Sequence, residues 1–432
     1  MPSPDPLQLQ ALSLVRTWLH DPAVARRYAF SPADFTRTRR LSFALVATFI
    51  LTAHRYALNA KIKWLDRLTD TLSGLFSASA LCQARAKLRA ELFRDLGREL
   101  ARSHEQAARQ AGHWRTQAGA RVLAADCTWL HLPDTPETRL RFGVHPNGGT
   151  AEAVMAQTST VVDALNGLVL SAAPCHSAGE AALLMSAHPP DLLRPGDILL
   201  LDRGYCSYPL LAWLAGKRVH PVLRLQRSSF AAAERFRRSG RAQGSLTLRR
   251  PPQAGKHLPK ILEVRLVRVW LGGEEAVLLT TLPGGTPRTL AALYRLRWDQ
   301  ESFFGRWKNT LECERVSGRR MCAVEQDFHA LVLLANLESI LARSVQKAFD
   351  AAEAGGAPPC RVNRKDSLSS VAWHTARLLA DPSVPLESAC ARITRELRHG
   401  PVLIRPDRSH PRKPPTASGQ VRFLKYARRV TP

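Results

Sequence analysis

The chain has 432 residues, enough for two or three domains and a sizeable hydrophobic core. Its 62 Lys and Arg outnumber its 36 Asp and Glu, and the formal charge of +26 indicates a polyanionic partner, most simply a nucleic acid. The eight cysteines form no CxxC pair and no Cys/His cluster at zinc-ligand spacing, which argues against a zinc site. Ribosome association or a generally basic proteome would give the same charge.

Two features bear on location. The longest apolar run, residues 41–53, is too short to cross a bilayer and starts too deep in the chain for a signal peptide. It predicts a buried helix. Scattered cysteines without pairing motifs are typical of reduced thiols, so the sequence predicts a cytoplasmic protein without a membrane partner.

Residues 8–112 favour helices, because apolar residues recur every three or four positions and glycine is nearly absent. A basic helix that starts near Ser77 and follows a turn at Gly74 fits a helix-turn-helix that docks on DNA. In that arrangement Arg85 and Lys87 are candidate phosphate contacts. Surface helices with a few arginines are common, so this pattern alone is not specific.

The pattern changes at Arg121, where strands begin to alternate with helices. The predicted elements are a strand at 121–132, two strands within 151–175 joined by a turn at Asn166 and Gly167, a helix at 179–193, a buried strand at 198–201, a helix at 208–215 and a strand at 220–225. This order predicts a mixed α/β sheet.

Residues 227–283 interrupt the alternation. Their first part, 227–270, has 11 Lys and Arg against two Glu, and several strand-like runs predict a basic, β-rich insertion. A disordered basic loop is the alternative for the beginning of this segment. An apolar helix is predicted at 328–349, followed by a linker at 354–359, a final helical segment and a basic, Pro-rich tail.

Two aspartates stand where a solvated acid is not expected. Asp126 lies within a largely apolar strand, and Asp202 ends the apolar run 198–201. Burying an unpaired carboxylate is costly, so each needs a cation or hydrogen-bond donors. Taken singly, each is more often a structural Asp at a strand end or turn.

The segment "LYRLRWDQESFFGRWKNTL", residues 293–311, predicts one helix with two different faces. Residues seven apart return to nearly the same azimuth, so Tyr294, Glu301 and Lys308 share a stripe that Arg297 joins. The ordinary interpretation is a solvated face with an Arg–Glu pair. If Glu301 meets Asp126 and Asp202, however, three carboxylates form an oxygen-rich site for two Mg²⁺ or Mn²⁺ ions, as used in phosphoryl transfer.

At this point the sequence resembles a known family. The spacing Tyr294-x2-Arg297-x3-Glu301-x6-Lys308 is similar to the YREK signature of DDE transposases of the insertion-sequence-four group. "DRGY" at Asp202 and "DCTWLHLPDT" at Asp126 look like the family's two Asp motifs. Cys127 departs from the small residue expected after the first Asp, and Asp134, next to Pro133, is a rival placed in a turn.

The resemblance implies an RNase H-like catalytic core at 116–345 with the β-rich insertion at 227–283. It implies a helical DNA-binding domain at 1–115 before the core and a helical, basic region at 346–432 after it. Asp126, Asp202 and Glu301 would be the catalytic metal ligands for Mg²⁺ or Mn²⁺, and Tyr294, Arg297 and Lys308 would hold DNA phosphates.

The implied activity is cut-and-paste movement of an insertion sequence. The protein would bind terminal inverted repeats and target DNA as a homodimer in a synaptic complex, in a bacterial cytoplasm and associated with the nucleoid. Trp298, Trp270 or Trp307 could stack on a displaced base, although core packing is the simpler role for Trp307. Two alternatives stay open: an RNase H-like nuclease that joins nothing, and an inactive transposase-derived DNA-binding protein.

Overall fold

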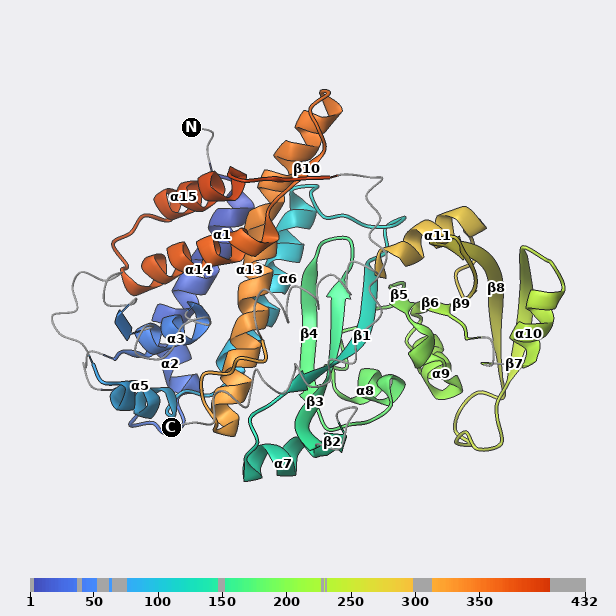
Figure 1. Ribbon diagram of the computed structural model, residues 1–432, viewed down its shortest axis with the longest axis horizontal. Helices are drawn as coiled ribbons and strands as arrows, with labels where there is room; N and C mark the ends of the chain where they lie inside the picture. Colours follow the sequence, from blue (N-terminus) through green and yellow to red (C-terminus); the bar gives the residue numbers. More distant parts are fainter. Residues whose placement is uncertain are drawn as a thin grey trace.

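The computed structural model shows a helical body beside a long twisted sheet (Figure 1). It describes residues 4–36, 41–52, 62–63, 76–146, 152–226, 229, 231–297 and 313–404. The helices are α1 (Pro6–His20), α2 (Pro22–Tyr28), α3 (Phe43–Thr52), α5 (Ala78–Arg85), α6 (Glu91–Gln110), α7 (Pro136–Phe142), α8 (Glu180–Ser186), η1 (Arg203–Tyr205), α9 (Tyr208–Gly216), α10 (Ala231–Arg238), α11 (Pro287–Arg295), α13 (Met321–Ala354), α14 (Arg364–Ala380) and α15 (Leu386–Arg398). The strands are β1 (Val122–His131), β2 (Val144–Pro146), β3 (Glu152–Asp163), β4 (Leu168–Cys175), β5 (Ile198–Leu201), β6 (His220–Arg224), β7 (Gln243–Arg249), β8 (Ile261–Leu271), β9 (Glu274–Thr280), β10 (Cys360–Arg361) and β11 (Val402–Leu403).

Strand β1 lies inside the sheet. It pairs antiparallel with β3 on one side and parallel with β5 on the other. Beyond them, β4 pairs antiparallel with β3, and β6 pairs parallel with β5 through the α9 crossover. The strand order in this part of the sheet is β4–β3–β1–β5–β6, and the predicted mixed α/β sheet is confirmed.

The β-rich insertion continues this sheet. Strand β9 pairs antiparallel with β6, and β8 and β7 follow outward, so the described residues form one nine-stranded, mostly antiparallel sheet. The beginning of the insertion contains helix α10, where a disordered loop was the alternative. The helix predicted at 179–193 is shorter, because α8 ends at Ser186, ahead of Pro189 and Pro190, which cannot continue it.

The two faces of the sheet are covered by different helices. Leu123 and Ala125 pack in the core that includes side chains of α8, α9 and α10. Val122 and Ala124 pack on the opposite face, in the core that includes α11. Because side chains alternate along a strand, Asp126 continues the set that faces α11.

The helical body has one shared core. Helices α1, α3, α6, α13, α14 and α15 all contribute buried side chains to it, and β4 packs against it. On α13, Asn336 accepts a hydrogen bond from the backbone N–H of Val169 and donates one to its carbonyl, each at 2.8 Å. The amide thereby satisfies backbone groups on the free edge of β4 and fixes the helical body to the sheet.

Among the described helices, α13 is long and apolar enough to cross a membrane. However, 78% of its most apolar 18-residue stretch is buried inside the protein. Such burial is the pattern of a core helix. The predicted buried helix at 41–53 is confirmed by α3, whose residues are all buried.

The domain boundaries expected at residues 115 and 345 stay predictions. Helix α13 runs through residue 345, and the first and last helices share a core. The turn predicted at Gly74 lies outside the described residues. All eight cysteines are free thiols.

Candidate active site at the ends of two parallel strands

Asp126 in the middle of β1 and Asp202 directly after β5 lie close together on neighbouring strands. The parallel register pairs Ala124 of β1 with Leu200 of β5, and two residues further along both chains it brings Asp126 opposite Asp202. Neighbouring strands are about 4.8 Å apart, and residues in register share a face of the sheet. The two aspartates that the sequence predicted to act together are therefore adjacent.

Asp126 is held in place by two neighbours. Its Oδ1 accepts a hydrogen bond from the backbone N–H of Cys127 at 2.8 Å, and its Oδ2 lies 3.7 Å from Nη1 of Arg297. The side chains of Asp126 and Arg297 are only 15% and 6% exposed, so water screens this ion pair poorly. Arg297 compensates the charge of Asp126 and fixes its orientation.

Asp202 caps the short helix η1. Its Oδ1 accepts a hydrogen bond from the backbone N–H of Gly204 at 2.7 Å. Beneath this turn, the fully buried Tyr205 brings its hydroxyl to 3.5 Å from Sγ of Cys127. Burial raises the pKa of the Cys127 thiol to about 11, so the residue after the first aspartate is compact and uncharged at neutral pH.

Glu180, the first residue of α8, is a third carboxylate at this place. A Cβ added to Gly204 would lie 2.1 Å from Oε2 of Glu180 and 3.2 Å from Oδ1 of Asp202, so both acids approach this glycine and a side chain there would displace Glu180. Oε2 of Glu180 is buried and has no hydrogen-bond partner among the described residues. Burial, together with the charges of Asp202 and Asp126, raises the pKa of Glu180 to about 7.

Sequence reasoning missed Glu180. An acid in the first turn of a helix is ordinary, because it complements the helix dipole. The only local signal was Gly204 within "DRGY", where a side chain would collide with an approaching group.

The site carries more negative charge than its neighbours neutralise. Asp126, Asp202 and Glu180 face one described guanidinium, that of Arg297, which leaves an excess of two negative charges when all four groups are ionised. A divalent cation with oxygen ligands fits both this excess and the unpaired Oε2 of Glu180. Within the described ranges no three His, Cys, Asp or Glu side chains form a ready metal cluster, and the predicted ligand Glu301 lies outside those ranges.

The predicted helix at 293–311 differs from expectation at its beginning. Helix α11 ends at Arg295 and Leu296 forms a turn, so the predicted continuous helix is interrupted there. Tyr294 is 1% exposed, with the Arg297 guanidinium 5.6 Å from its ring centroid. Arg297 therefore lies between the buried Tyr294 ring and Asp126, and direct contact of Tyr294 and Arg297 with DNA stays a prediction. Three further predicted site residues, Trp298, Glu301 and Lys308, lie outside the described residues.

Arginines flank the acidic site. A pocket of about 390 Å³ includes Arg203, the residue after Asp202, with Arg224 and Arg237. Glu274 and Glu275 also line it, and Glu274 lies 3.6 Å from Arg224, so the pocket has one positive charge in excess. Trp270, at the end of β8, is 60% exposed and stands opposite Glu275 of the same pocket. Positive charge and an exposed aromatic ring therefore lie within reach of a nucleic acid strand that enters this end of the sheet.

Arg85 and Lys87 differ in exposure. Arg85 is 7% exposed, and its guanidinium binds Asp327 and the carbonyl of Ala323, each at 2.8 Å, as well as Gln326. These α13 partners occupy the guanidinium of Arg85, and a contact of Arg85 with DNA stays a prediction. Lys87 is exposed, with Asp34 at 3.4 Å, and its contact with DNA stays a prediction.

The rival aspartate is excluded from the site by its position. Asp134 stands in the turn before α7, with a side chain that is 56% exposed and paired with Arg139. This pairing lowers the pKa of Asp134. The preference for Asp126 over Asp134 agrees with this geometry.

Residues 117–337, more than half of the chain, match the model of the transposase DDE domain family. The chain belongs to this family. Both adjacent aspartates lie within the matched segment, and the resemblance expected from the sequence motifs is confirmed.

The chain is also similar to a curated transposase. The chain is 28% identical over 239 residues to "Transposase InsG for insertion sequence element IS4" of Escherichia coli (strain K12). The match covers 52% of this chain and 52% of the relative, so the chain spans about half the length of the curated relative it matches. Among solved structures, a piggyBac transposase synaptic complex with hairpin DNA has a TM-score of 0.47 and 12% identity, over 90% of this chain and 87% of that chain.

Proposed function

We propose that the protein is a DNA transposase that binds the terminal inverted repeats of an insertion sequence and moves the element by metal-dependent cleavage and strand transfer. It acts as a homodimer on duplex DNA, in a bacterial cytoplasm and associated with the nucleoid. Membership of the transposase DDE domain family supports this proposal. The observation that carries it is the register that makes Asp126 and Asp202 adjacent, with Arg297 on Asp126.

In this proposal Asp126, Asp202 and Glu301 hold two divalent cations, Mg²⁺ or Mn²⁺. When bound, such a pair of ions activates the attacking oxygen and stabilises the leaving oxygen of a phosphodiester. Arg297 keeps the Asp126 carboxylate oriented toward the site. Glu180 adds a carboxylate oxygen that has no partner in the described residues.

The DNA strand lies along the basic surroundings of these acids. Lys308 and the arginines of the neighbouring pocket, such as Arg203, neutralise phosphates, while Trp298 or Trp270 stacks on a base. Water attacks the phosphorus at the element's end, a new P–O bond forms, and the bond to the 3′ oxygen breaks and leaves a 3′-hydroxyl. That hydroxyl then attacks a phosphodiester of the target DNA in the same way.

The test is cleavage of a labelled duplex that carries the element's own end, in Mg²⁺ or Mn²⁺. Asp202→Asn keeps the shape of the side chain and removes its charge, and it is expected to lose cleavage by at least about a hundredfold while still binding DNA. Glu301→Gln is expected to behave alike. Asp134→Asn is the matched control, because that exposed aspartate lies in a turn outside the site and its variant is expected to cut normally.

The outcomes separate the candidate functions. Cleavage followed by joining to target DNA supports the transposase, and cleavage without joining supports a nuclease of the same fold. If wild type binds the end but does not cut under conditions that support a related enzyme, the catalytic proposal is wrong. The protein is then a DNA-binding relative of transposases.

A further inference from the structure

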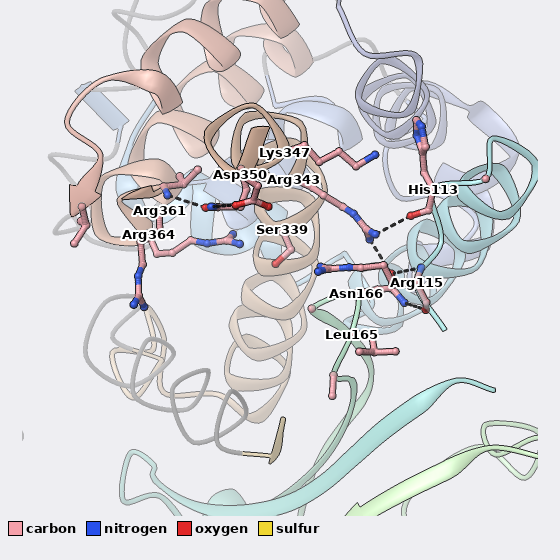
Figure 2. A pocket seen from close by; sticks show the side chains of 16 residues that line it. His113, Arg115, Leu165, Asn166, Ser339, Arg343, Lys347, Asp350, Arg361 and Arg364 are labelled. Atoms are coloured by element: carbon pink, nitrogen blue, oxygen red, sulfur yellow. Dashed lines mark hydrogen bonds between the residues drawn. The ribbon is translucent and has the colours of Figure 1, made fainter. Parts of the chain in front are cut away.

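A second basic feature lies away from the carboxylates, between the helical body and the sheet. A pocket of about 880 Å³ is formed by the segment after α6, the β3–β4 turn, the last turns of α13 and the beginning of α14 (Figure 2). The charged side chains that line it are Arg115, Arg343, Lys347, Arg361, Arg364 and Asp350. Five cations therefore share a pocket with one carboxylate.

Part of the pocket is rigidly built. Arg343 donates a hydrogen bond to Oδ1 of Asn166 at 2.8 Å and another to the carbonyl of His113 at 2.7 Å (Figure 2). Asn166 is 5% exposed, and it accepts from the backbone N–H of Arg115 and donates to its carbonyl. These bonds hold the Arg343 guanidinium and the backbone of Arg115 in one fixed arrangement before any ligand arrives.

The positive charge of the pocket is largely uncompensated. Arg364 pairs with Glu338 at 2.7 Å, whereas Arg115, Lys347 and Arg361 have no ion pair within the described residues. Burial and the nearby Arg343 lower the pKa of Lys347. Similarly, burial and Arg115 lower the pKa of Arg343 to about 10, so Arg343 stays charged at neutral pH.

We propose that this pocket binds the phosphodiester backbone of a DNA segment, in addition to the DNA contacts near the carboxylates. Arg343 and Lys347 lie four residues apart on one face of α13, which is about 6 Å along the helix axis. A DNA strand rises about 3.4 Å per nucleotide, so the spacing of the two cations is comparable to two nucleotide steps. Among the described residues that line the pocket there is no Phe, Tyr or Trp, so these residues offer charge to phosphates and no platform for stacked bases.

The pocket is separate from the carboxylate site. Its residues Ala164 to Gly167 lie in the β3–β4 turn, beside the first residues of β1, whereas Asp126 lies in the middle of β1 and Asp202 directly after β5. Four residues of strand, about 13 Å, separate Val122 from Asp126. The bound segment is therefore a stretch of duplex away from the cleaved bond, and this inference rests on the proposed DNA transposase.

The test compares two triple variants with equal loss of charge. The pocket variant carries Arg115→Gln, Lys347→Gln and Arg361→Gln, which leaves the structural bonds of Arg343 intact. The control carries Arg377→Gln, Arg392→Gln and Arg398→Gln, three exposed arginines of α14 and α15 that do not line the pocket. Thermal melting first verifies that both are folded.

The measurement is the affinity for a fluorescent duplex carrying the element's end at several NaCl concentrations. Each lost phosphate contact reduces the slope of log K against log salt by about 0.9, so the pocket variant is expected to lose about 2 to 3 in slope and about tenfold or more in affinity at low salt. The control is expected to keep the wild-type slope within about 1. An equal change in both variants, or none in the pocket variant, overturns the inference.

Failure of the inference is distinguishable from failure of the proposed function. The Asp202→Asn variant is measured in the same experiment. It is expected to keep the wild-type slope of log K against log salt and to lose DNA cleavage. If wild type does not cut but the pocket variant alone loses slope, the transposase proposal fails and the DNA-binding pocket stands. If wild type cuts and the pocket variant keeps its slope, only the pocket inference fails.

Discussion

The Glu180 carboxylate shows how a single residue can be unfavourable for the folded chain and useful for its function. Its buried Oε2 has no hydrogen-bond partner among the described residues, and Asp202 is near, so ionisation is opposed both by lost hydration and by a like charge. Folded proteins keep such groups mostly at functional sites. A divalent cation would reverse both penalties at once.

Glu180→Gln is expected to stabilise the metal-free protein at neutral pH. The pKa of Glu180 is raised to about 7, so the folded protein binds this proton more tightly than the unfolded chain does. The stabilisation of the folded protein by this proton is fully present below the ordinary glutamate pKa near 4.5, and it is lost as pH rises through about 7. Allowing for partial solvent screening, Gln should raise the free energy of unfolding by about 1–2 kcal/mol at pH 7.5 and change it little at pH 4.5.

Calorimetry at the two pH values, with and without Mn²⁺, checks this expectation. Mn²⁺ should raise the melting temperature of wild type more than that of Glu180→Gln, since the variant lacks one carboxylate. Glu353→Gln, at an exposed position near the end of α13, is the control and should melt like wild type. Equal stability of wild type and Glu180→Gln at both pH values would show that the carboxylate is better solvated than the geometry indicates.

At the scale of elements, α5 and α13 are joined by one buried charge pair. Arg85 of α5 reaches Asp327 of α13 at 2.8 Å, and Ser317 also bonds to Asp327. Gln326, the neighbouring residue on α13, donates hydrogen bonds to the carbonyls of Arg85 and Leu88. The segment that the sequence placed on DNA is thus fixed to the catalytic core by polar side chains.

Arg85→Met is expected to lower the free energy of unfolding by about 3–5 kcal/mol, because it leaves the Asp327 carboxylate buried without its cation. Adding Asp327→Asn should recover part of that loss, since the uncompensated charge is then removed. Urea denaturation of the single and double variants measures both effects. A double variant less stable than Arg85→Met would mean that Asp327 is stabilised chiefly by its other hydrogen bonds.

Lys87→Met is the matched control for this experiment. Its ammonium lies 3.4 Å from Asp34 with 45% of the side chain exposed, and such surface pairs contribute about 0–1 kcal/mol. The two substitutions lie two residues apart and remove the same charge. Their difference in stability therefore reports the burial and the hydrogen bonds of Arg85.

At the scale of the whole molecule, the sequence was sufficient for features that depend on local pattern. Asp126 and Asp202 were identifiable because each interrupts or ends an apolar run, and the turn at Asn166 and Gly167 follows from its residue types. The alternating helices and strands likewise fixed the mixed sheet.

What the sequence could not predict depends on distant partners. Glu180 reaches the site only through the fold of α8 against η1, and the contact of Arg297 with Asp126 joins residues 171 positions apart. Helical periodicity does not reveal the turn at Leu296, because that residue is itself a good helix former. The burial of Arg85 was equally invisible, since it depends on α13.

The excess charge of the chain should make its stability depend on salt and on DNA. A formal charge of +26 destabilises the compact state by self-repulsion, which salt screens. The melting temperature should therefore rise by several degrees between about 20 and about 300 mM NaCl.

Duplex DNA should raise the melting temperature further at low salt and much less at high salt, because counterion release drives binding. Scanning calorimetry measures both, and a duplex of the same sequence with an uncharged backbone is the control. If the uncharged duplex stabilises the protein equally, base contacts rather than phosphates dominate, and the excess of Lys and Arg serves some purpose other than holding the DNA backbone.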